Sequence, residues 1–368
     1  MPSETGSAHP GGEHPREGGT HEAPGEPALP PSDRIAVVIN GNAKRVNDEV
    51  IDTLDQILSA GELFVSRRVE EGRYIARTLV ERGYGTVLLG GGDGTFTVMV
   101  SDIVREARRQ GKAPPRFGLL RLGTGNALAW VIGASQVKRG GLKVDLERLR
   151  GDAGSRPIRL VEVEEYLAPF CGFGIDALVL RDYNQVKSAI ARGPLRSLAP
   201  GVLTYVVSST FLSLPAFLLR PVPHVRVVNQ GADAYRLGEK GSIVGRPIRK
   251  GEVIYEGRAR IASVSTIPYY GFGFRCFPFA EERTDRMNLR ISTIGSFTVV
   301  ANFPSIWKGQ YENLELIFDY LVEQISIETD PDTEFQIGGD PVGKRRQVQV
   351  RLSPEPIRLV DFYAPPRG

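Results

Sequence analysis

Strand-like and helix-like hydrophobic patterns alternate along the chain from residue 35 to about residue 130. Such alternation is typical of an α/β domain with a parallel sheet and helices on both faces. Ligands of these sheets bind beyond the carboxyl ends of the strands. Short apolar runs predict strands at 35–39, 63–65, 86–89 and 117–122, and apolar residues at helical spacing predict helices near 50–58, 73–81 and 100–107.

The pattern changes after about residue 155, where strand-like segments prevail. Many of them alternate apolar and polar positions, as antiparallel strands with one exposed face do. One region, from about 175 to 219, instead fits a helical excursion. The strand-like segments are 158–163, 224–228, 253–264, 287–292, 325–328 and 348–352.

Part of the helical excursion, residues 202–219, contains no charged residue. Its length is near that of a membrane span. Pro215 and five hydroxyl residues weaken that interpretation. We expect a buried or lipid-facing helix there.

Composition divides the chain further. Residues 1–32 include 13 Gly or Pro and no apolar period, which predicts a disordered tail. An α/β domain is expected at 33–155, and a β-rich domain, mostly an antiparallel β-sandwich, at 156–368. The tail has five Glu and one Arg, a net charge of −4, so the rest of the chain carries +7 of the total of +3. A mildly basic body suits an anionic partner, although ordinary scatter of surface charge explains it equally well.

Cysteine and histidine content excludes several kinds of chemistry. The two cysteines form no disulfide framework, which favours a reducing compartment. Three of the four histidines lie in the tail, so neither a zinc site nor a histidine-based triad is indicated. The first residues lack the apolar region of a signal peptide. We expect a cytoplasmic protein that is peripheral at a membrane at most.

Two glycine-rich turns follow neighbouring predicted strands. Residues 90–97 read Gly-Gly-Gly-Asp-Gly-Thr-Phe-Thr, and residues 123–126 read Gly-Thr-Gly-Asn. Glycine lets backbone N–H groups approach a ligand, and a helix N-terminus attracts anions. Asp93 adds a carboxylate that suits a metal ion. The pair predicts a phosphate site with a metal-facing carboxylate, although tight strand-to-helix turns alone would also use glycine.

At these motifs the chain resembles the diacylglycerol kinase catalytic-domain family, which includes bacterial lipid kinases, sphingosine kinases and ceramide kinases. The resemblance runs from about residue 34 to about 362. It rests on Gly91-Gly92-Asp93-Gly94-Thr95, on 123–129, on Asn40 after the first strand, on 172–177 and on 278–289.

The resemblance implies ATP- and Mg²⁺-dependent transfer of phosphate to the hydroxyl of a diacylglycerol-like or sphingoid lipid. The first domain would bind nucleotide and the second would bind lipid. Asp93 would lie against the phosphates and Mg²⁺, and Asp176 would accept a hydrogen bond from the lipid head group, although it could instead be a helix N-cap. The residues expected to hold the nucleotide are Asn40, Gly91, Gly92, Gly94, Thr95, Arg121, Gly123, Thr124, Gly125 and Asn126.

Several positions depart from the family pattern. The Asp-Gly-Glu motif near the C-terminus aligns with Gly338-Gly339-Asp340, so the residue that usually serves as base is a glycine. Thr97 and Val98 replace the usual Asn-Glu after the first turn. Arg121 replaces a proline, and either adds positive charge beside the phosphates or forms a surface salt bridge.

These departures leave alternatives open. One is an active lipid kinase whose base is Asp93 or Asp340. A second is a catalytically impaired relative that binds lipid or nucleotide, and a third is a kinase of a soluble NAD-like substrate. Nucleotide, lipid and transient membrane contact are the expected partners, with no nucleic acid. A homodimer is compatible with the sequence.

Overall fold

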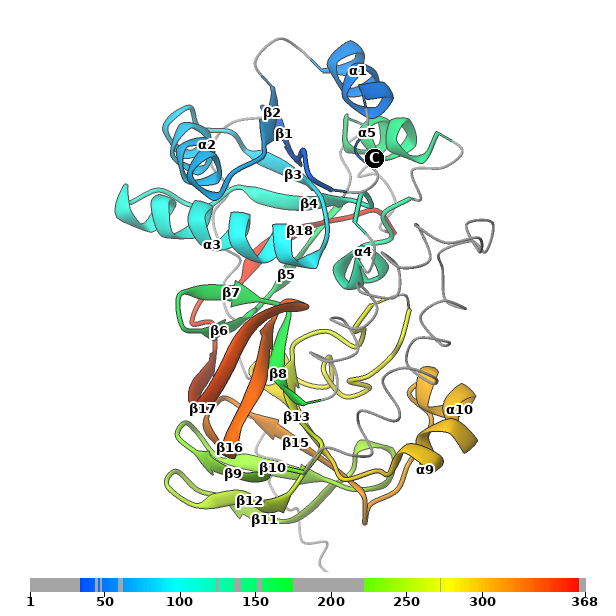
Figure 1. Ribbon diagram of the computed structural model, residues 1–368. Coiled ribbons are helices and arrows are strands. Elements are labelled where there is room, and N and C mark those ends of the chain that lie inside the picture. Colours follow the sequence, from blue (N-terminus) through cyan, green and yellow to red (C-terminus); the bar gives the residue numbers. More distant parts are fainter. Residues whose placement is uncertain are drawn as a thin grey trace, which may run out of the picture.

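A computed structural model describes residues 34–43, 46, 48–58, 62–123, 126–135, 140–150, 154–174, 222–271 and 273–363. The described residues form two domains, one above the other in Figure 1. The predicted tail at 1–32, the helical excursion at 175–219 and Asp176 lie outside the described residues.

The first domain is built on a six-stranded sheet in the order β2-β1-β3-β4-β18-β5. Strands β1 to β4 are parallel, as the alternating pattern predicts. Their apolar residues are buried, with Val37, Val87 and Leu88 each 0% exposed. The elements are β1 (Ile35–Asn40), α1 (Asp48–Ile57), β2 (Leu63–Ser66), α2 (Val69–Glu81), β3 (Thr86–Gly90), α3 (Asp93–Arg109), β4 (Arg116–Leu120), α4 (Ala127–Val131) and α5 (Gly141–Arg150).

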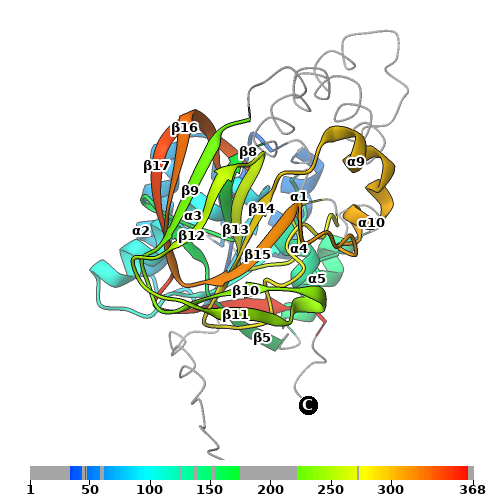
Figure 2. The same ribbon diagram turned by 90° about the horizontal axis from the view of Figure 1, so that it is seen from below.

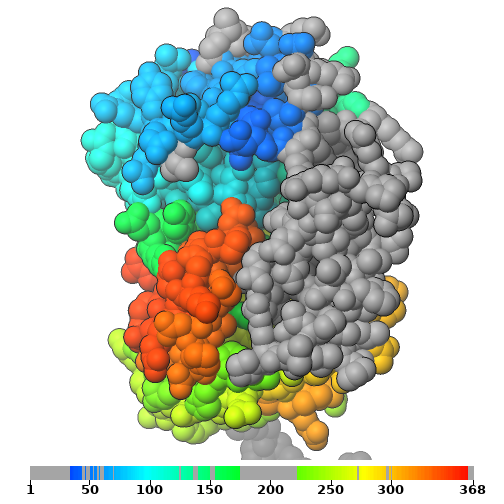
Figure 3. Space-filling model, viewed as in Figure 1, coloured from blue at the N-terminus to red at the C-terminus, as the bar shows by residue number. Residues whose placement is uncertain are grey.

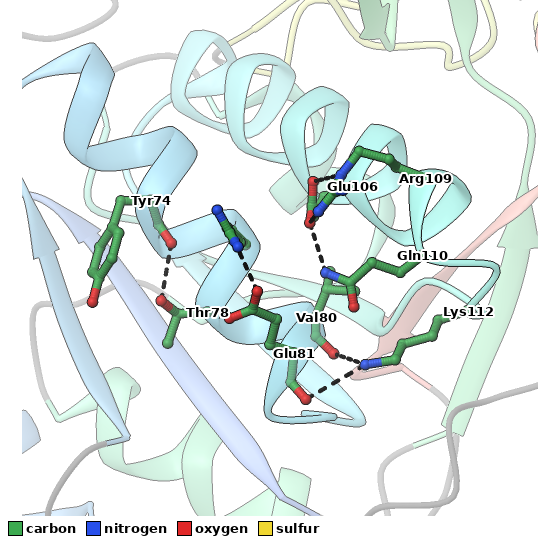
Figure 4. A network of polar contacts seen from close by, with 9 residues as sticks. Tyr74, Thr78, Val80, Glu81, Glu106, Arg109, Gln110 and Lys112 are labelled. Atoms are coloured by element: carbon green, nitrogen blue, oxygen red, sulfur yellow. Dashed lines mark hydrogen bonds and ion pairs between the residues drawn. The ribbon is translucent and has the colours of Figure 1, made fainter.

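Helices α2 and α3 pack side by side on this sheet, and polar contacts join their C-terminal ends (Figure 4). Lys112 Nζ donates to the carbonyl oxygens of Val80 at 3.0 Å and Glu81 at 3.5 Å, which end α2. At the C-terminal end of α3, Glu106 accepts hydrogen bonds from Arg109 and from the C-cap residue Gln110. A lysine at a helix C-terminus satisfies its last carbonyl groups. These contacts fix the C-terminal end of α3 against α2 and leave the N-terminal end of α3 free of them.

The end of the chain returns to the first sheet. Strand β18 (Ile357–Asp361) lies parallel to β4 and antiparallel to β5 (Gly154–Ile158). Residues 357–361 therefore lie in the first sheet, although the sequence pattern assigns everything from 156 onward to the second domain. The hydrophobic pattern of a segment predicts that it is a strand, but it does not tell which sheet the strand joins.

The second domain is a 12-stranded sheet in which every pairing is antiparallel. Its strands turn strongly from one end of the sheet to the other (Figure 2). The predicted fold class, a parallel α/β domain followed by a mostly antiparallel β domain, is confirmed. The elements are β6 (Val161–Val163), β7 (Tyr166–Ala168), β8 (Phe170–Gly174), β9 (His224–Asn229), β10 (Ala234–Leu237), the 3₁₀ turn η2 (Glu239–Gly241), β11 (Ile243–Ile248), β12 (Val253–Arg258), β13 (Ile261–Ser265), β14 (Met287–Ser292), α9 (Ser296–Ala301), α10 (Phe303–Trp307), β15 (Ile317–Val322), β16 (Gln324–Ile337) and β17 (Asp340–Leu352).

Strands β16 and β17 are much longer than the runs 325–328 and 348–352 predict. Most of the added residues are polar, so they carry little hydrophobic signal. The first part of β16 pairs with β9 and the last part with β8, while β17 follows it on the other side. In the space-filling view this hairpin, orange to red, abuts the first domain (Figure 3). The hairpin thus carries its turn to the junction of the domains.

Helix α3 and strand β7 join the two domains directly. Ser101 Oγ donates to the Thr97 carbonyl oxygen at 2.5 Å and accepts the Leu167 backbone N–H at 2.8 Å. Arg105 also donates to the Glu165 carbonyl oxygen at 2.8 Å. The N-terminal half of α3 is therefore fixed against the second domain. Among the helices in the described part of the chain, none has the length and apolar character needed to cross a membrane.

Candidate active site

The two glycine turns lie in direct backbone contact. A Cβ atom on Gly123 would lie 2.3 Å from the Gly92 Cα and 2.6 Å from the Gly91 carbonyl oxygen. A Cβ atom on Gly91 would overlap the Thr95 side chain, 2.4 Å from its Oγ1. Both turns follow adjacent parallel strands, β3 and β4, so they meet at one sheet edge. Glycine at these positions is what allows the two turns to touch.

Asp93 joins the first turn to helix α4. It is 8% exposed, and its Oδ2 accepts the Ala127 N–H at 2.8 Å while Oδ1 accepts the Leu128 N–H at 3.4 Å. The pKa of Asp93 is raised to about 6, chiefly by burial and to a smaller extent by the negative charge of Asp340, against the two amide hydrogen bonds, which lower it. The carboxylate therefore caps α4 and fixes it against α3.

Asp340 reaches the same place from the second domain. A Cβ atom on Gly94 would lie 1.8 Å from Asp340 Oδ2 and 2.6 Å from its Cγ, so the carboxylate occupies the space that a side chain at 94 would fill. The residue is exposed at the start of β17, but burial around its carboxylate raises the pKa of Asp340. Two carboxylates with raised pKa values thus lie at the first turn of α3.

The turn before Asp340 lies against α3 as well. Gly338 has a left-handed φ of 57°, and a Cβ atom there would lie 2.1 Å from Thr97 Oγ1. Gly338 N–H donates to the Phe170 carbonyl oxygen at 2.9 Å. Gln336 Oε1 accepts the Gly339 N–H at 2.8 Å. Thr97 and Gly338, two of the departures from the family pattern, are therefore neighbours in space.

Asn40 and Thr95 meet beside the glycine turns. Asn40 ends β1, and its Nδ2 donates to Thr95 Oγ1 at 3.1 Å. Asn40 Oδ1 accepts the Asn42 N–H at 2.9 Å. The N-cap of α3 is Gly92, and no side chain in the described residues caps this helix end. First-turn N–H groups of such a helix are available to an anion or water.

Asn126 closes the second turn. It has a left-handed φ of 47°, and its Nδ2 donates to the Gly123 carbonyl oxygen at 2.8 Å. It is 2% exposed, and its Oδ1 accepts no hydrogen bond within the described ranges. A buried polar atom of this kind is costly unless a ligand or water satisfies it.

Arg121 packs against α4. Its guanidinium carbon lies 4.9 Å from the centre of the Trp130 ring, a cation–π contact. Its positive charge also lowers the pKa of Asp145, although burial makes the net shift of that carboxyl upward.

Three other predicted site residues lie outside the residues that the structure describes: Thr124, Gly125 and Asp176. The structure brings Asn40, Gly91, Gly92, Asp93, Gly94, Thr95, Gly123, Asn126 and Asp340 together at one sheet edge. Sequence reasoning did not single out Gln336, which positions the Gly338–Gly339 turn, or Ser101, which fixes α3 to β7. Only the place of Gln336, two residues before the Gly-Gly-Asp motif, offered a signal.

The donor set for a metal ion is sparse. Within the described ranges no group of three or more His, Cys, Asp or Glu side chains is placed to hold a metal. Mg²⁺ commonly binds through one or two carboxylates together with substrate phosphates and water. Asp93 and Asp340 provide two carboxylates beside the helix N-terminus, and a bound cation would offset the repulsion from Asp340 that helps to raise the pKa of Asp93. These residues fit Mg²⁺ that arrives with a nucleotide.

The described residues therefore define a two-domain protein with its candidate site at the N-terminus of α3. Residues 34–162 match the family model of the diacylglycerol kinase catalytic domain. This match confirms the family resemblance over the first domain and the beginning of the second. No curated protein sequence matches the chain.

Two solved structures from Bacillus anthracis str. Sterne share the fold over both domains. One, described as a proposed diacylglycerol kinase, is 15% identical with a TM-score of 0.60 and covers 90% of this chain and 98% of its own. Another, described as a diacylglycerol kinase, is 13% identical with a TM-score of 0.55 and covers 89% and 97%. At this level of identity the likeness establishes the fold.

Proposed function

We propose that the protein is an ATP-dependent lipid kinase that transfers the γ-phosphate to a lipid hydroxyl. The proposal rests chiefly on the contact between Asp340 and Gly94, because it brings a carboxylate of the second domain to the glycine turn of the first. The match of residues 34–162 to a diacylglycerol kinase catalytic domain supports a kinase activity.

The nucleotide phosphates would lie at the N-terminus of α3. Gly91, Gly92 and Gly123 leave the backbone uncovered there, and the helix dipole favours negative charge. The Asn40–Thr95 pair and Asn126 would supply side-chain hydrogen bonds, and the unpartnered Asn126 Oδ1 could accept one from a ligand. Phosphoryl transfer depends mainly on positioning and charge stabilisation, which such a site supplies.

The two carboxylates would have different roles. Asp340, at the start of β17, would accept the proton of the lipid hydroxyl, because its residue is exposed and the described residues donate no hydrogen bond to its carboxylate. Asp93 is buried and accepts two amide hydrogen bonds, so it would hold α4 and bind Mg²⁺ together with the phosphates. Mg²⁺, when bound, would neutralise charge on the phosphate oxygens. A raised pKa brings a carboxylate closer to the range that suits a general base.

The acceptor is the least constrained part of the proposal. A lipid acceptor would require transient contact with a membrane surface. Purified protein should be incubated with γ-labelled ATP and Mg²⁺ in three separate arms: a mixed lipid extract, sphingoid bases and NAD. Label in a lipid that falls at least tenfold in Asp340→Asn supports the proposal. Label in NAD alone would identify a soluble-substrate kinase.

A second candidate is a nucleotide-binding relative without efficient transfer. One observation favours it: residue 338 is a glycine, and the Thr97 hydroxyl occupies the place of its Cβ. ATP binding by calorimetry with no labelled product in any arm would establish this candidate and reject the kinase. Absence of ATP binding would reject both.

A further inference from the structure

A cavity whose wall includes several arginine residues lies at the domain junction, away from the glycine turns. It has a volume of about 210 Å³, and its lining includes Arg156, Arg159, Arg283, Arg286 and Glu281. Arg156 lies in strand β5 and Arg159 directly follows it, whereas the others belong to the segment before β14 in the second domain. Both domains therefore contribute to its wall, and Figure 1 shows β5 between them.

The cavity is at the opposite edge of the first sheet from the candidate active site. The glycine turns follow the carboxyl ends of β3 and β4. Strand β18 runs parallel to β4, and Ile357 at its start pairs with Ile158, next to Arg159. The cavity-lining residues Leu352 and Pro356 precede β18. The cavity thus opens at the amino ends of these parallel strands.

Positive charge exceeds negative charge around this cavity. Arg156 is paired with Glu281 at 2.9 Å. Arg283 and Arg286 share Asp285, each at 2.8 Å. Arg159 forms no ion pair with any described residue. Four guanidinium groups and two carboxylates leave an excess of two positive charges. Repulsion between them is costly where water is partly excluded.

Two guanidinium groups also hold buried donors without partners. Arg286 is 9% exposed, and although its Nη1 donates to Asp285, its Nε has no acceptor in the described part of the chain. Arg159 Nε is also buried and also has no acceptor among the described residues. A buried donor without an acceptor destabilises the fold unless a ligand or water satisfies it. One unpartnered donor comes from each domain, and both residues line the cavity.

We infer that this cavity binds a phosphate monoester group. A dianionic phosphate would balance the two excess charges and accept hydrogen bonds from guanidinium N–H donors, for which Arg has the matching planar geometry. The cavity is below the range of roughly 300–1,000 Å³ typical of drug-sized ligands, which suits a phosphate with a small substituent. Because the two domains share the wall, the bound group would hold them together.

The ligand chemistry has two sources, a soluble phosphate ester and the head group of an anionic lipid. Calorimetry on the full chain would use glycerol 3-phosphate as the soluble probe. Flotation would compare phosphatidylcholine vesicles with and without phosphatidic acid. Binding of the soluble probe alone would identify the first source, and selective flotation with phosphatidic acid the second. Either result supports phosphate binding in this cavity only if the binding requires Arg159.

Arg159→Gln is the decisive variant, because this side chain has no ion pair within the described ranges and its loss removes one repelling charge. We expect at least a fivefold weaker affinity for the probe, with ATP affinity unchanged. The melting temperature without probe should be equal to or above that of the wild type. The exposed Arg249, replaced by Gln, is the matched control and should leave probe binding unchanged.

Arg286→Gln gives a second variant, although its contacts with Asp285 and the Asp233 carbonyl oxygen also support the fold. Circular dichroism would establish that each variant is folded. Probe binding by Arg159→Gln equal to the wild type would overturn the inference, as would a wild-type protein that binds neither probe at millimolar concentration. A loss of ATP affinity equal to the loss of probe affinity would show that the probe binds at the glycine turns instead.

Discussion

The carboxylate of Asp340 occupies the space that a side chain on Gly94 would take. Asp340 begins strand β17 of the second domain, and Gly94 lies in the first turn of α3 in the first domain. Glycine at 94 is therefore required for the carboxylate to reach the helix N-terminus. The site depends on a contact between domains as well as on the glycine turns of one domain.

Gly94→Ala tests this contact. The added methyl group would displace the Asp340 carboxylate, and we expect kcat/KM for phosphate transfer to fall on the order of 10- to 100-fold. Alanine is favoured in helices by about 0.5–1 kcal/mol over glycine, so the variant should remain folded. Steady-state kinetics and thermal unfolding would be measured together.

Gly72→Ala in helix α2 is the matched control. Its Cβ would meet Met99 Sδ at 3.4 Å, which is close to ordinary contact. Activity should stay within about twofold of the wild type. Equal activity in both variants would show that the position of Asp340 is unimportant for transfer.

Asp93 should make stability depend on pH. Its pKa is about 6 in the folded protein against 3.8 for an unperturbed aspartate, so the folded state binds the proton more tightly than the unfolded state. This contribution is fully present below pH 3.8 and is lost as the pH rises through 6. The loss amounts to about 3 kcal/mol, from 1.36 kcal/mol for each pKa unit.

Denaturant unfolding between pH 4 and pH 7.5 would measure this effect. We expect the free energy of unfolding of Asp93→Asn to fall less over this range than that of the wild type. The exposed Asp52, replaced by Asn, serves as a control and should follow the wild type. Parallel curves for the wild type and Asp93→Asn would contradict the raised pKa.

Thr97 and Gly338 should be energetically coupled. Gly338→Asp places a Cβ 2.1 Å from Thr97 Oγ1, and such overpacking costs about 1–3 kcal/mol. Thr97→Ala removes a buried hydroxyl that has no partner in the described structure, and should be neutral or stabilising. The double variant should recover at least about 1 kcal/mol relative to the sum of the single changes.

The same variants address turnover. If the missing carboxylate at 338 limits transfer, activity should rise in the double variant and not in Gly338→Asp alone. A double-mutant cycle from urea unfolding, with activity measured on the same samples, provides both values. Strictly additive free energies would exclude the coupling.

Ser101 should stabilise the domain junction. In Ser101→Ala the Leu167 N–H loses its acceptor, and Leu167 is 6% exposed. We expect the free energy of unfolding to fall by about 1–3 kcal/mol and amide exchange at Leu167 to become faster. Ser66→Ala, which removes an exposed hydrogen bond to the Arg68 carbonyl oxygen, should cost less than about 0.5 kcal/mol. Equal losses in the two variants would show that the hydrogen bond between α3 and β7 stabilises the protein no more than an exposed hydrogen bond does.

The sequence pattern was sufficient for the fold class and for the meeting of the glycine turns. Apolar runs at β1, β3 and β4 are buried on both faces, and parallel strands bring their carboxyl ends to one edge. The contact between Gly92 and Gly123 follows from that arrangement. These features are local in sequence or are set by a single sheet.

The remaining features depend on contacts that local periodicity does not encode. The long hairpin β16–β17 is largely polar, so the hydrophobic pattern predicts neither its length nor its contact with α3. The hydrogen bonds from Ala127 and Leu128 to Asp93 depend on where α4 begins. Arg121 faces Trp130, a partner nine residues along the chain that the glycine turn brings back.

Strand β18 has a consequence for the order of events during synthesis. Its partners β4 and β5 leave the ribosome long before residues 357–361 do. Until then the edge of β4 remains unpaired, and an exposed edge strand invites association with other chains. Completion of the first domain should therefore wait for the whole chain, and a fragment ending near residue 155 should aggregate rather than fold as an independent unit.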